Sequence, residues 1–91
     1  MEGIRKERPR REDLERMGVA NWPIREKEVS ESERHYDEGE TCCILEGRVR
    51  VEPRGGAKAV GFGPGDLVTF PEGLDCTWKV TRPVRKHNRF G

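Results

Sequence analysis

The fold is decided by residues 40–78, which read ETCCILEGRVRVEPRGGAKAVGFGPGDLVTFPEGLDCTW. Short apolar or alternating runs are separated here by turns rich in glycine and proline, and eight of the eleven glycines of the chain fall between residues 39 and 73. Val49 and Val51 alternate with charged residues, which is typical of a strand with one buried face. Several short strands bounded by turn residues predict an all-β sandwich or barrel.

The turn residues predict where these strands begin and end. We expect a hairpin of residues 41–45 and 48–52 that turns at Glu46-Gly47, and further strands at 57–62, 67–70, 76–80 and 84–90. Pro83 is expected to separate the last two strands, because proline has no N–H to donate to a ladder. Upstream, residues 29–36 are predicted to form a polar strand.

The first 21 residues are expected to form an arm with one short helix. Pro9 suits a first helical turn, Leu14 and Met17 lie on one apolar stripe, and Gly18 is typical of a helix end. Residues 22–91 then form the barrel, so the chain is one domain of residues 1–91. Trp22-Pro23-Ile24 is predicted to be an edge strand that packs its tryptophan into the wall.

Composition excludes several classes of function. The chain has 18 Lys and Arg against 17 Asp and Glu, without the basic excess typical of nucleic-acid binders. It has no apolar run long enough to cross a membrane, and its first residues lack the apolar segment of a secretory signal, so we expect a cytoplasmic protein. Three cysteines make no disulfide framework, and the neighbours Cys42 and Cys43 should face opposite sides of a strand as separate thiols.

Two spacings in the central stretch resemble the sequence motifs of the cupin superfamily. Glu40-(x6)-Gly47 is similar to the second half of the first cupin motif, and Gly65-Asp66-(x4)-Pro71-(x)-Gly73 is similar to the second motif. The two lie in the right order along residues 36–90. This resemblance implies a small jelly-roll β-barrel with antiparallel strands.

A closer resemblance is to a small single-domain branch of cupins related to the ureidoglycine-aminohydrolase and ethanolamine-utilisation groups, some of whose members have no assigned activity. It covers about three-quarters of the chain. The residues that carry it are Trp22-Pro23-Ile24, Tyr36-Asp37, Glu40-Thr41-Cys42, Ile44-Leu45-Glu46-Gly47, Gly65-Asp66-Leu67-Val68-Thr69-Phe70-Pro71, Cys76-Thr77-Trp78 and Val84-Arg85-Lys86-His87.

The resemblance also implies a metal centre of histidines and one glutamate, and this chain departs from it. The histidine places of the first motif fall on Arg34 and Tyr36, or after a shift of one residue on Glu33 and His35. The histidine place of the second motif falls on Cys76, and the branch usually has an aromatic residue at position 34 and a tyrosine at position 88.

Glu40 and Cys76 are the only candidates left for a metal, and both are weak. We therefore expect no cofactor, with a weakly bound divalent metal as the alternative.

Strand alternation predicts which side chains face the interior. If Glu40 points inward, so do Cys42 and Ile44, and in the last strand Val84 and Phe90 mark the face that carries Lys86. The predicted ligand-binding residues around one cavity mouth are Tyr36, Glu40, Cys76, Trp78 and Lys86.

Three functions are compatible with this set. The first is a barrel that holds a small polar or carboxylate-bearing metabolite on Lys86, Glu40 and Tyr36. The second is a lyase, isomerase or hydrolase, with Glu40 as base and Tyr36 or Lys86 as acid. The third is a scaffold with a filled interior, in which Glu40 and Lys86 form a buried ion pair. Trp22 and an apolar outer wall favour a homodimer through the sheet edges.

One further motif carries less weight in the sequence. Gly61-(x)-Gly63-(x)-Gly65 has the glycine spacing of a phosphate-binding loop, but no helix is expected to follow it. Without the free N–H groups of a helix start, the spacing alone does not predict a phosphate site.

Overall fold

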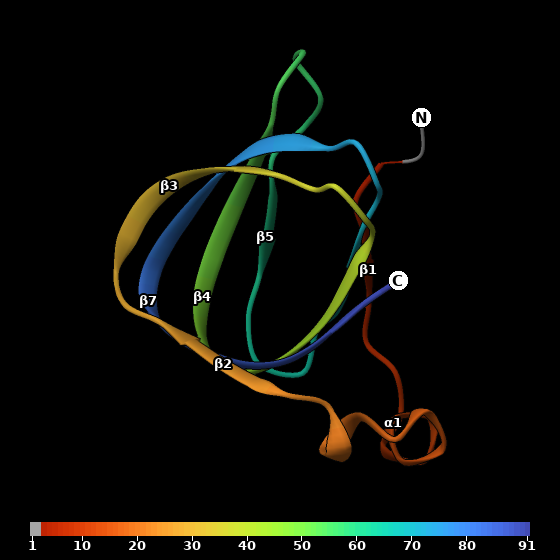
Figure 1. Ribbon diagram of the computed structural model, residues 1–91. Coiled ribbons are helices and arrows are strands. Elements are labelled where there is room, and N and C mark those ends of the chain that lie inside the picture. The colour runs from red at the N-terminus through yellow and green to blue at the C-terminus, as the bar shows by residue number, and fades with distance from the viewer. Residues whose placement is uncertain (1–2) are drawn as a thin grey trace.

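The structure, a computed structural model, describes residues 3–91. It is mostly antiparallel β-sheet with one short α-helix (Figure 1). In chain order the elements are β1 (Arg5–Glu7), α1 (Arg11–Met17), the 3-10 helix η1 (Val19–Asn21), β2 (Ile24–Lys27), β3 (Ser30–His35), β4 (Glu40–Pro53), β5 (Val60–Phe62), β6 (Leu67–Phe70) and β7 (Asp75–Phe90).

The strands form one seven-stranded sheet in the order β1-β6-β4-β7-β2. The two long strands, β4 and β7, each use one part of their length for one neighbour and the rest for another: β4 pairs with β6 and then β5, and β7 pairs with β3 and then β2. The sheet therefore curls around an interior (Figure 1). Within residues 3–91 the end strands β1 and β2 do not pair with each other, so the predicted closed barrel is not confirmed.

The core lies inside this curl and contains four aromatic side chains, three from strands β5, β6 and β7 and one, Tyr36, from the loop after β3. Phe62 contacts Phe70 and Trp78 edge-on, with ring centroids 5.9 and 5.8 Å apart. Tyr36 stacks on Phe70 at 5.0 Å with its ring nearly parallel. Aromatic pairs in such offset and edge-on arrangements add to the stabilisation that comes from burying their area, which compensates for the low apolar content of the chain.

The hairpin predicted at Glu46-Gly47 is wrong, because residues 40–53 are one continuous strand, β4. The strand is irregular at the predicted turn: from Ile44 to Val49 it advances five residues while its partner β7 covers six, from Lys86 to Val80. This β-bulge switches the buried side chains of β4 from even to odd positions. The prediction that the two valines of residues 48–52 face inward is confirmed nonetheless.

Gly47 permits the bulge. Its φ is +100°, a conformation that side chains of L-residues rarely adopt. A Cβ at this position would overlap the carbonyl oxygen of Pro83 and lie 2.7 Å from the Cα of Val84. The backbones of β4 and β7 therefore approach each other here in a way that only glycine allows.

The predicted break at Pro83 is also wrong, since residues 75–90 form the single strand β7. Pro83 lies between the part of β7 that pairs with β3, which ends at Val80, and the part that pairs with β2, which begins at Val84. It also faces the bulge of β4. Pro83 therefore lies where β7 changes its partner from β3 to β2. No ladder hydrogen bond is required of its nitrogen there, so the strand is not interrupted.

The N-terminal helix begins two residues later than predicted, at Arg11, with the Arg10 N–H donating to Asp13 Oδ2 at 3.1 Å. It ends at Gly18, as predicted, in the left-handed conformation with φ +69°. Figure 1 shows α1 outside the curled sheet. Its apolar residues pack with η1 against the outer face in a second cluster, whose members are Leu14, Met17, Val19, Trp22, Cys43 and Leu67.

Trp22 is therefore not part of a wall strand. It precedes β2, packs in the outer cluster, and has the guanidinium of Arg89 4.5 Å from its ring. Ile24, which was expected to face the same side, is 42% exposed. The tryptophan packs against the chain's own helix, because this part of the arm lies over the outer face of the sheet.

The other predicted strands differ mainly in length. The polar strand of residues 29–36 is β3, residues 67–70 are β6 as predicted, and the strand of residues 57–62 shortens to β5 at Val60–Phe62. Residues 54–59 run through the turn at the tip of the β4–β5 hairpin (Figure 1). Within residues 3–91 no helix is long and apolar enough to cross a membrane.

Candidate functional site

Strand alternation places the predicted site residues inside the sheet, as expected. All five are almost fully buried, with exposed fractions from 1 to 5%: Tyr36, Glu40, Cys76, Trp78 and Lys86. Asn88, two residues after Lys86 on the same face of β7, is also buried. The prediction that Phe90 faces inward at the end of β7 is wrong, because its side chain is 49% exposed. Val84, the other apolar residue used to identify this face, is buried.

Glu40 is the centre of the buried polar group. It lies at the start of β4 between Phe70 of β6 and Phe90 of β7, and its side chain is 1% exposed. Asn88 Nδ2 donates a hydrogen bond of 2.8 Å to Oε2 of Glu40, and Lys86 Nζ lies 3.8 Å from the same oxygen. The buried carboxylate is thus paired by charge, as buried charges normally are.

Two oxygens of this group have no hydrogen-bond partner in the part of the chain that the structure describes. They are Oε1 of Glu40 and Oδ1 of Asn88. The Glu40 carboxylate can only accept hydrogen bonds, so the NH₂ group of Asn88 points toward it. The carbonyl oxygen of the same amide, Oδ1, therefore points away from Glu40. Burying an acceptor without a partner costs about 1–3 kcal/mol. Two such atoms on neighbouring side chains therefore indicate a place where a donor is missing.

Lys86 lies between polar and aromatic partners. Its Nζ is 3.5 Å from Cys42 Sγ, which accepts a weak hydrogen bond, and 4.5 Å from the centroid of Trp78. An ammonium over an indole ring is stabilised by the negative face of the ring. These contacts replace part of the lost hydration, and Lys86 keeps capacity for one more acceptor.

Tyr36 and Trp78 form a second buried pair, in which Trp78 Nε1 donates to the Tyr36 hydroxyl at 3.0 Å. Burial raises the pKa of Tyr36 far above its ordinary value. The hydroxyl therefore keeps its proton and can donate it in a further hydrogen bond. This makes Tyr36 suited to holding a ligand and a poor acid for catalysis at neutral pH.

Arg34 covers this cluster. Its guanidinium stands 4.9 Å from the Tyr36 ring and 5.2 Å from the Trp78 ring, and Nη2 is 3.5 Å from Oε1 of Glu40. The side chain is 29% exposed, so one side of it faces solvent. Outside it, a hollow of about 270 Å³ is lined by residues 34–38 and Phe90.

The predicted cavity mouth is consequently covered rather than open. Of the five residues expected to line it, Tyr36 reaches the outer hollow, while Glu40, Cys76, Trp78 and Lys86 are absent from its lining. Arg34 fills the position because the arginine side chain is long enough to stack on both aromatic rings and still reach the carboxylate.

Arg34 and Asn88 were not among the predicted site residues, although a signal for both was present. Arg34 precedes Tyr36 by two residues and Asn88 follows Lys86 by two, so alternation alone puts each on the inward face. Asn88 lay on the inward face predicted for the last strand but was not counted as a site residue, and Arg34 was considered only as one of the histidine places of the first motif. Asn88 is buried because it pairs with Glu40, and Arg34 because it pairs with Glu40 while one side stays in water.

The cysteines are three separate buried thiols. Cys42 packs in the main core and Cys43 on the opposite face in the outer cluster, as the sequence predicted for neighbours in a strand. Burial raises the pKa of Cys42 to about 12, and it also raises the pKa of Cys43 and of Cys76. Thiols that hold their protons are weak nucleophiles and weak metal ligands.

Thiol modification tests this arrangement. At pH 8 the three cysteines of the native protein are expected to react with Ellman's reagent at least about a hundredfold more slowly than in concentrated guanidinium, because both access and thiolate fraction are low. Cys42→Ser, Cys43→Ser and Cys76→Ser assign each rate. A native thiol that reacts nearly as fast as in the denatured protein would contradict the burial of that residue.

The two histidines do not belong to the site. His35 is exposed, and its Nδ1 lies 2.7 Å from Oδ1 of Asp75, a hydrogen bond that raises the pKa of the imidazole. Nδ1 of His87 lies 2.9 Å from the Trp22 carbonyl oxygen, to which it donates. Both histidines therefore lie outside the buried polar group around Glu40.

The residues around Glu40 do not fit a metal ion. Arg34 and Lys86 place positive charge 3.5 and 3.8 Å from the two carboxylate oxygens, where a cation would be repelled. Cys76, the other weak candidate, has a raised pKa, whereas a thiol ligand must lose its proton. Among residues 3–91 no group of three or more His, Cys, Asp or Glu side chains could hold a metal ion.

A curled antiparallel sheet with a buried glutamate at the start of its central strand and a short helix outside defines a small protein of the cupin fold. The sequence model of the EutQ-like cupin domain family matches residues 14–87, and the chain belongs to this family. No curated protein matches the chain.

Solved structures with this fold range from near to distant. A DUF861 family protein from Thermotoga maritima is 50% identical, with a TM-score of 0.93 over 97% of this chain and 99% of that one. The EutQ protein of Clostridium difficile is 16% identical with a TM-score of 0.66 over 74% of this chain and 52% of its own. A putative ethanolamine utilization protein Q from Salmonella typhimurium is 18% identical, also with a TM-score of 0.66, over 74% and 53%. This chain spans only about half the length of the two EutQ proteins, which share the fold alone.

Proposed function

We propose that this cupin binds a small polar metabolite in its interior, between Glu40, Asn88 and Lys86. The observation that carries the proposal is the pair of buried oxygens that have no hydrogen-bond partner within residues 3–91, Oε1 of Glu40 and Oδ1 of Asn88. Buried polar atoms normally find a partner, and an orphaned one calls for an explanation. A ligand that donates hydrogen bonds to both oxygens supplies it.

The chemistry of the ligand follows from the groups that face it. The free oxygens of Glu40 and Asn88 can accept hydrogen bonds from N–H or O–H groups of a ligand. Lys86, Arg34 and the Tyr36 hydroxyl can donate to a carboxylate or carbonyl oxygen of the same ligand. A small amino acid, hydroxy acid or amide carries both kinds of group. The metabolite must be small, because the aromatic core fills the remaining interior.

Entry requires Arg34 to move. Its contact with Glu40 is 3.5 Å, longer than a good hydrogen bond, and its partly exposed side chain can turn into the adjacent hollow. The ligand's own donors would then replace the arginine at Oε1. Arg34 thus acts as a cover whose displacement is coupled to binding.

A thermal-shift screen of small amino acids, hydroxy acids and amides tests the proposal. A ligand of the native state is expected to raise Tm by mass action, by about 10–20 °C at a hundred times its Kd. Glu40→Gln should weaken that ligand about tenfold or more, since a hydrogen bond to a charged group is lost. Glu72→Gln, an exposed carboxylate away from the cluster, is the matched control.

The alternatives are outcomes of the same screen. If no compound raises Tm, or if Glu40→Gln binds as well as the parent protein, the proposal fails and a scaffold with ordered water at the two oxygens is favoured. Turnover of a ligand, followed by NMR and lost in Glu40→Gln, would instead support an enzyme. The homodimer stays a prediction, with part of the outer wall covered by α1.

A further inference from the structure

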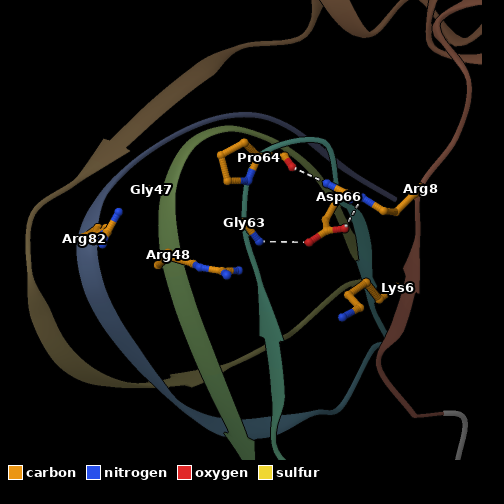
Figure 2. Close-up of a pocket in the computed structure, with 8 residues that line it drawn as sticks. All are labelled: Lys6, Arg8, Gly47, Arg48, Gly63, Pro64, Asp66 and Arg82. Atoms are coloured by element: carbon orange, nitrogen blue, oxygen red, sulfur yellow. Dashed lines mark hydrogen bonds and ion pairs between the residues drawn. The ribbon is translucent and has the colours of Figure 1, made fainter.

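A second hollow, separate from the interior, has a volume of about 510 Å³. It forms where four distant segments meet: the arm at β1, the bulge of β4, the turn before β6, and the middle of β7. Its lining residues are Lys6, Arg8, Gly47, Arg48, Gly63, Pro64, Asp66 and Arg82 (Figure 2). It shares no residue with the cluster around Glu40.

The lining carries four positive side chains and one negative one. The negative side chain, Asp66, is already engaged: its Oδ1 lies 3.2 Å from Arg8 Nε, and its Oδ2 accepts from the Gly63 N–H at 2.9 Å. Arg8 Nη2 also donates to the Pro64 carbonyl oxygen at 2.7 Å. These contacts, drawn in Figure 2, anchor the arm to the turn and use up the charge of one arginine.

The other three cations are not neutralised. Lys6 Nζ donates to the carbonyl oxygen of Gly61 at 3.1 Å, a neutral partner. Within residues 3–91 the only ion pair among the lining residues is the one between Arg8 and Asp66. The hollow therefore concentrates positive charge in a chain whose total formal charge is only +1.

Arg48 and Arg82 lie directly opposite each other in the β4–β7 ladder. Like charges in a cross-strand pair destabilise a sheet. The bulge brings these two positions into register, and both residues line the hollow. An anion between them would turn this repulsion into attraction.

Gly63 makes the approach of Arg48 possible. A Cβ at residue 63 would lie 2.9 Å from Nη1 and 3.2 Å from Cδ of Arg48. In Figure 2 the guanidinium of Arg48 and the amine of Lys6 point toward the space between them, next to Gly63. Gly63 and Gly65 thus give room to the side chains of Arg48 and Arg8. Strand β6, not a helix, follows these glycines.

We propose that this hollow binds a small oxyanion with two or more negative charges, of the phosphate-ester or diphosphate class, between Arg48, Arg82 and Lys6. The planar fork of arginine matches two oxygens of a phosphate group, and two arginines with a lysine can hold a diphosphate. The volume suits a small metabolite. A single carboxylate would leave most of the positive charge unbalanced.

Calorimetric titration with pyrophosphate at low ionic strength tests this proposal. Arg82→Ala and Arg48→Ala are each expected to weaken binding about tenfold or more, because each removes charge-assisted hydrogen bonds. Arg25→Ala is the matched control, an exposed arginine of β2 outside the hollow with the same change in net charge. It should change the affinity less than about twofold.

Further arms separate the possible results. Citrate, with three carboxylates, should bind more weakly than pyrophosphate, and Gly63→Ala should weaken pyrophosphate by displacing the Arg48 guanidinium. Glu40→Gln should leave pyrophosphate binding unchanged, so this test is independent of the interior site. Equal losses in Arg25→Ala and Arg82→Ala, no binding at millimolar pyrophosphate, or tighter binding of a single-stranded oligonucleotide would each overturn the proposal.

The variants also have an expected stability. Arg82→Ala should fold with an unchanged or higher Tm in the absence of pyrophosphate, because it removes the repulsion from Arg48. Pyrophosphate should raise the Tm of the parent protein and not that of the variant. A lower Tm for Arg82→Ala without anion would contradict the strained cross-strand pair on which the proposal rests.

Discussion

Replacing Gly47 with alanine is expected to lower the free energy of unfolding by about 3 kcal/mol or more. Two costs combine. The backbone has φ +100°, where a Cβ is strained, and the new methyl group would overlap the Pro83 carbonyl oxygen and crowd the Val84 Cα. Neither neighbour can give way easily, because both are backbone atoms of β7.

The control for this substitution is Gly55→Ala. Gly55 lies in the turn after β4, also with positive φ (+88°), but a Cβ there would meet nothing within 4 Å. It should cost only about 1–2 kcal/mol, from the backbone conformation alone. Urea denaturation of both variants measures the difference. Equal losses would show that β4 and β7 do not approach each other at the bulge as described.

The second large effect concerns the buried charges. Glu40→Leu is expected to lower the free energy of unfolding by about 3–5 kcal/mol, because Lys86 then remains buried without its counter-charge. Among residues 3–91, its Nζ has only the Cys42 thiol and the Trp78 ring as other partners. Arg34 loses its partner as well, but it can turn toward solvent.

The double variant Glu40→Leu/Lys86→Met separates the pair from the packing. Since apolar residues of similar volume can replace a buried ion pair at little cost, the double variant should recover most of the loss of the single one. Urea denaturation of the four proteins gives the coupling energy. If the two substitutions were additive, or if Glu40→Leu cost less than about 1 kcal/mol, the carboxylate and the ammonium would not be coupled as their 3.8 Å distance indicates.

These two predictions bear differently on function. Gly47 supports the bulge that places Arg48 opposite Arg82, so its replacement should disturb the anion hollow together with the fold. Glu40 and Lys86 belong to the proposed interior site, where an ion pair stabilises the fold little more than apolar residues of similar volume would. Two buried charged side chains in the core of so small a protein are consistent with a ligand that contacts them, and this is the reason to screen for one.

Strand parity was the part of the site that could be predicted from the sequence. A pleated strand sends alternate side chains to opposite faces, so Glu40 with Cys42, and Cys76 with Trp78, had to share a face whatever the tertiary structure. Burial confirms this grouping. The same rule puts Arg34 on the face of Tyr36 and Asn88 on the face of Lys86. Alternation does not show that both side chains pair with Glu40, which the structure does.

Turns were predictable only where local residues decide them. The turns before β6 and β7 follow from their glycines and prolines, as does the end of α1 at Gly18. Glu46-Gly47 has the residues of a turn but belongs to a bulge. A glycine is needed at position 47 because the Pro83 backbone approaches it closely, and the chain does not reverse there. Nothing within a few residues of Gly47 distinguishes the two cases.

The amino-acid sequence by itself determined the family, the β-rich class and the inward face of the long strands. It also determined that the histidine places of the second cupin motif and, in the unshifted register, of the first carry other residues. All of these depend on residue identity and spacing. Only the tertiary structure decided that the sheet stays open, that Arg34 covers the interior, and that Lys6, Arg8, Arg48 and Arg82 gather around one hollow. These features join segments far apart in the chain, and their geometry depends on how two bent strands pack against each other, which no local pattern records.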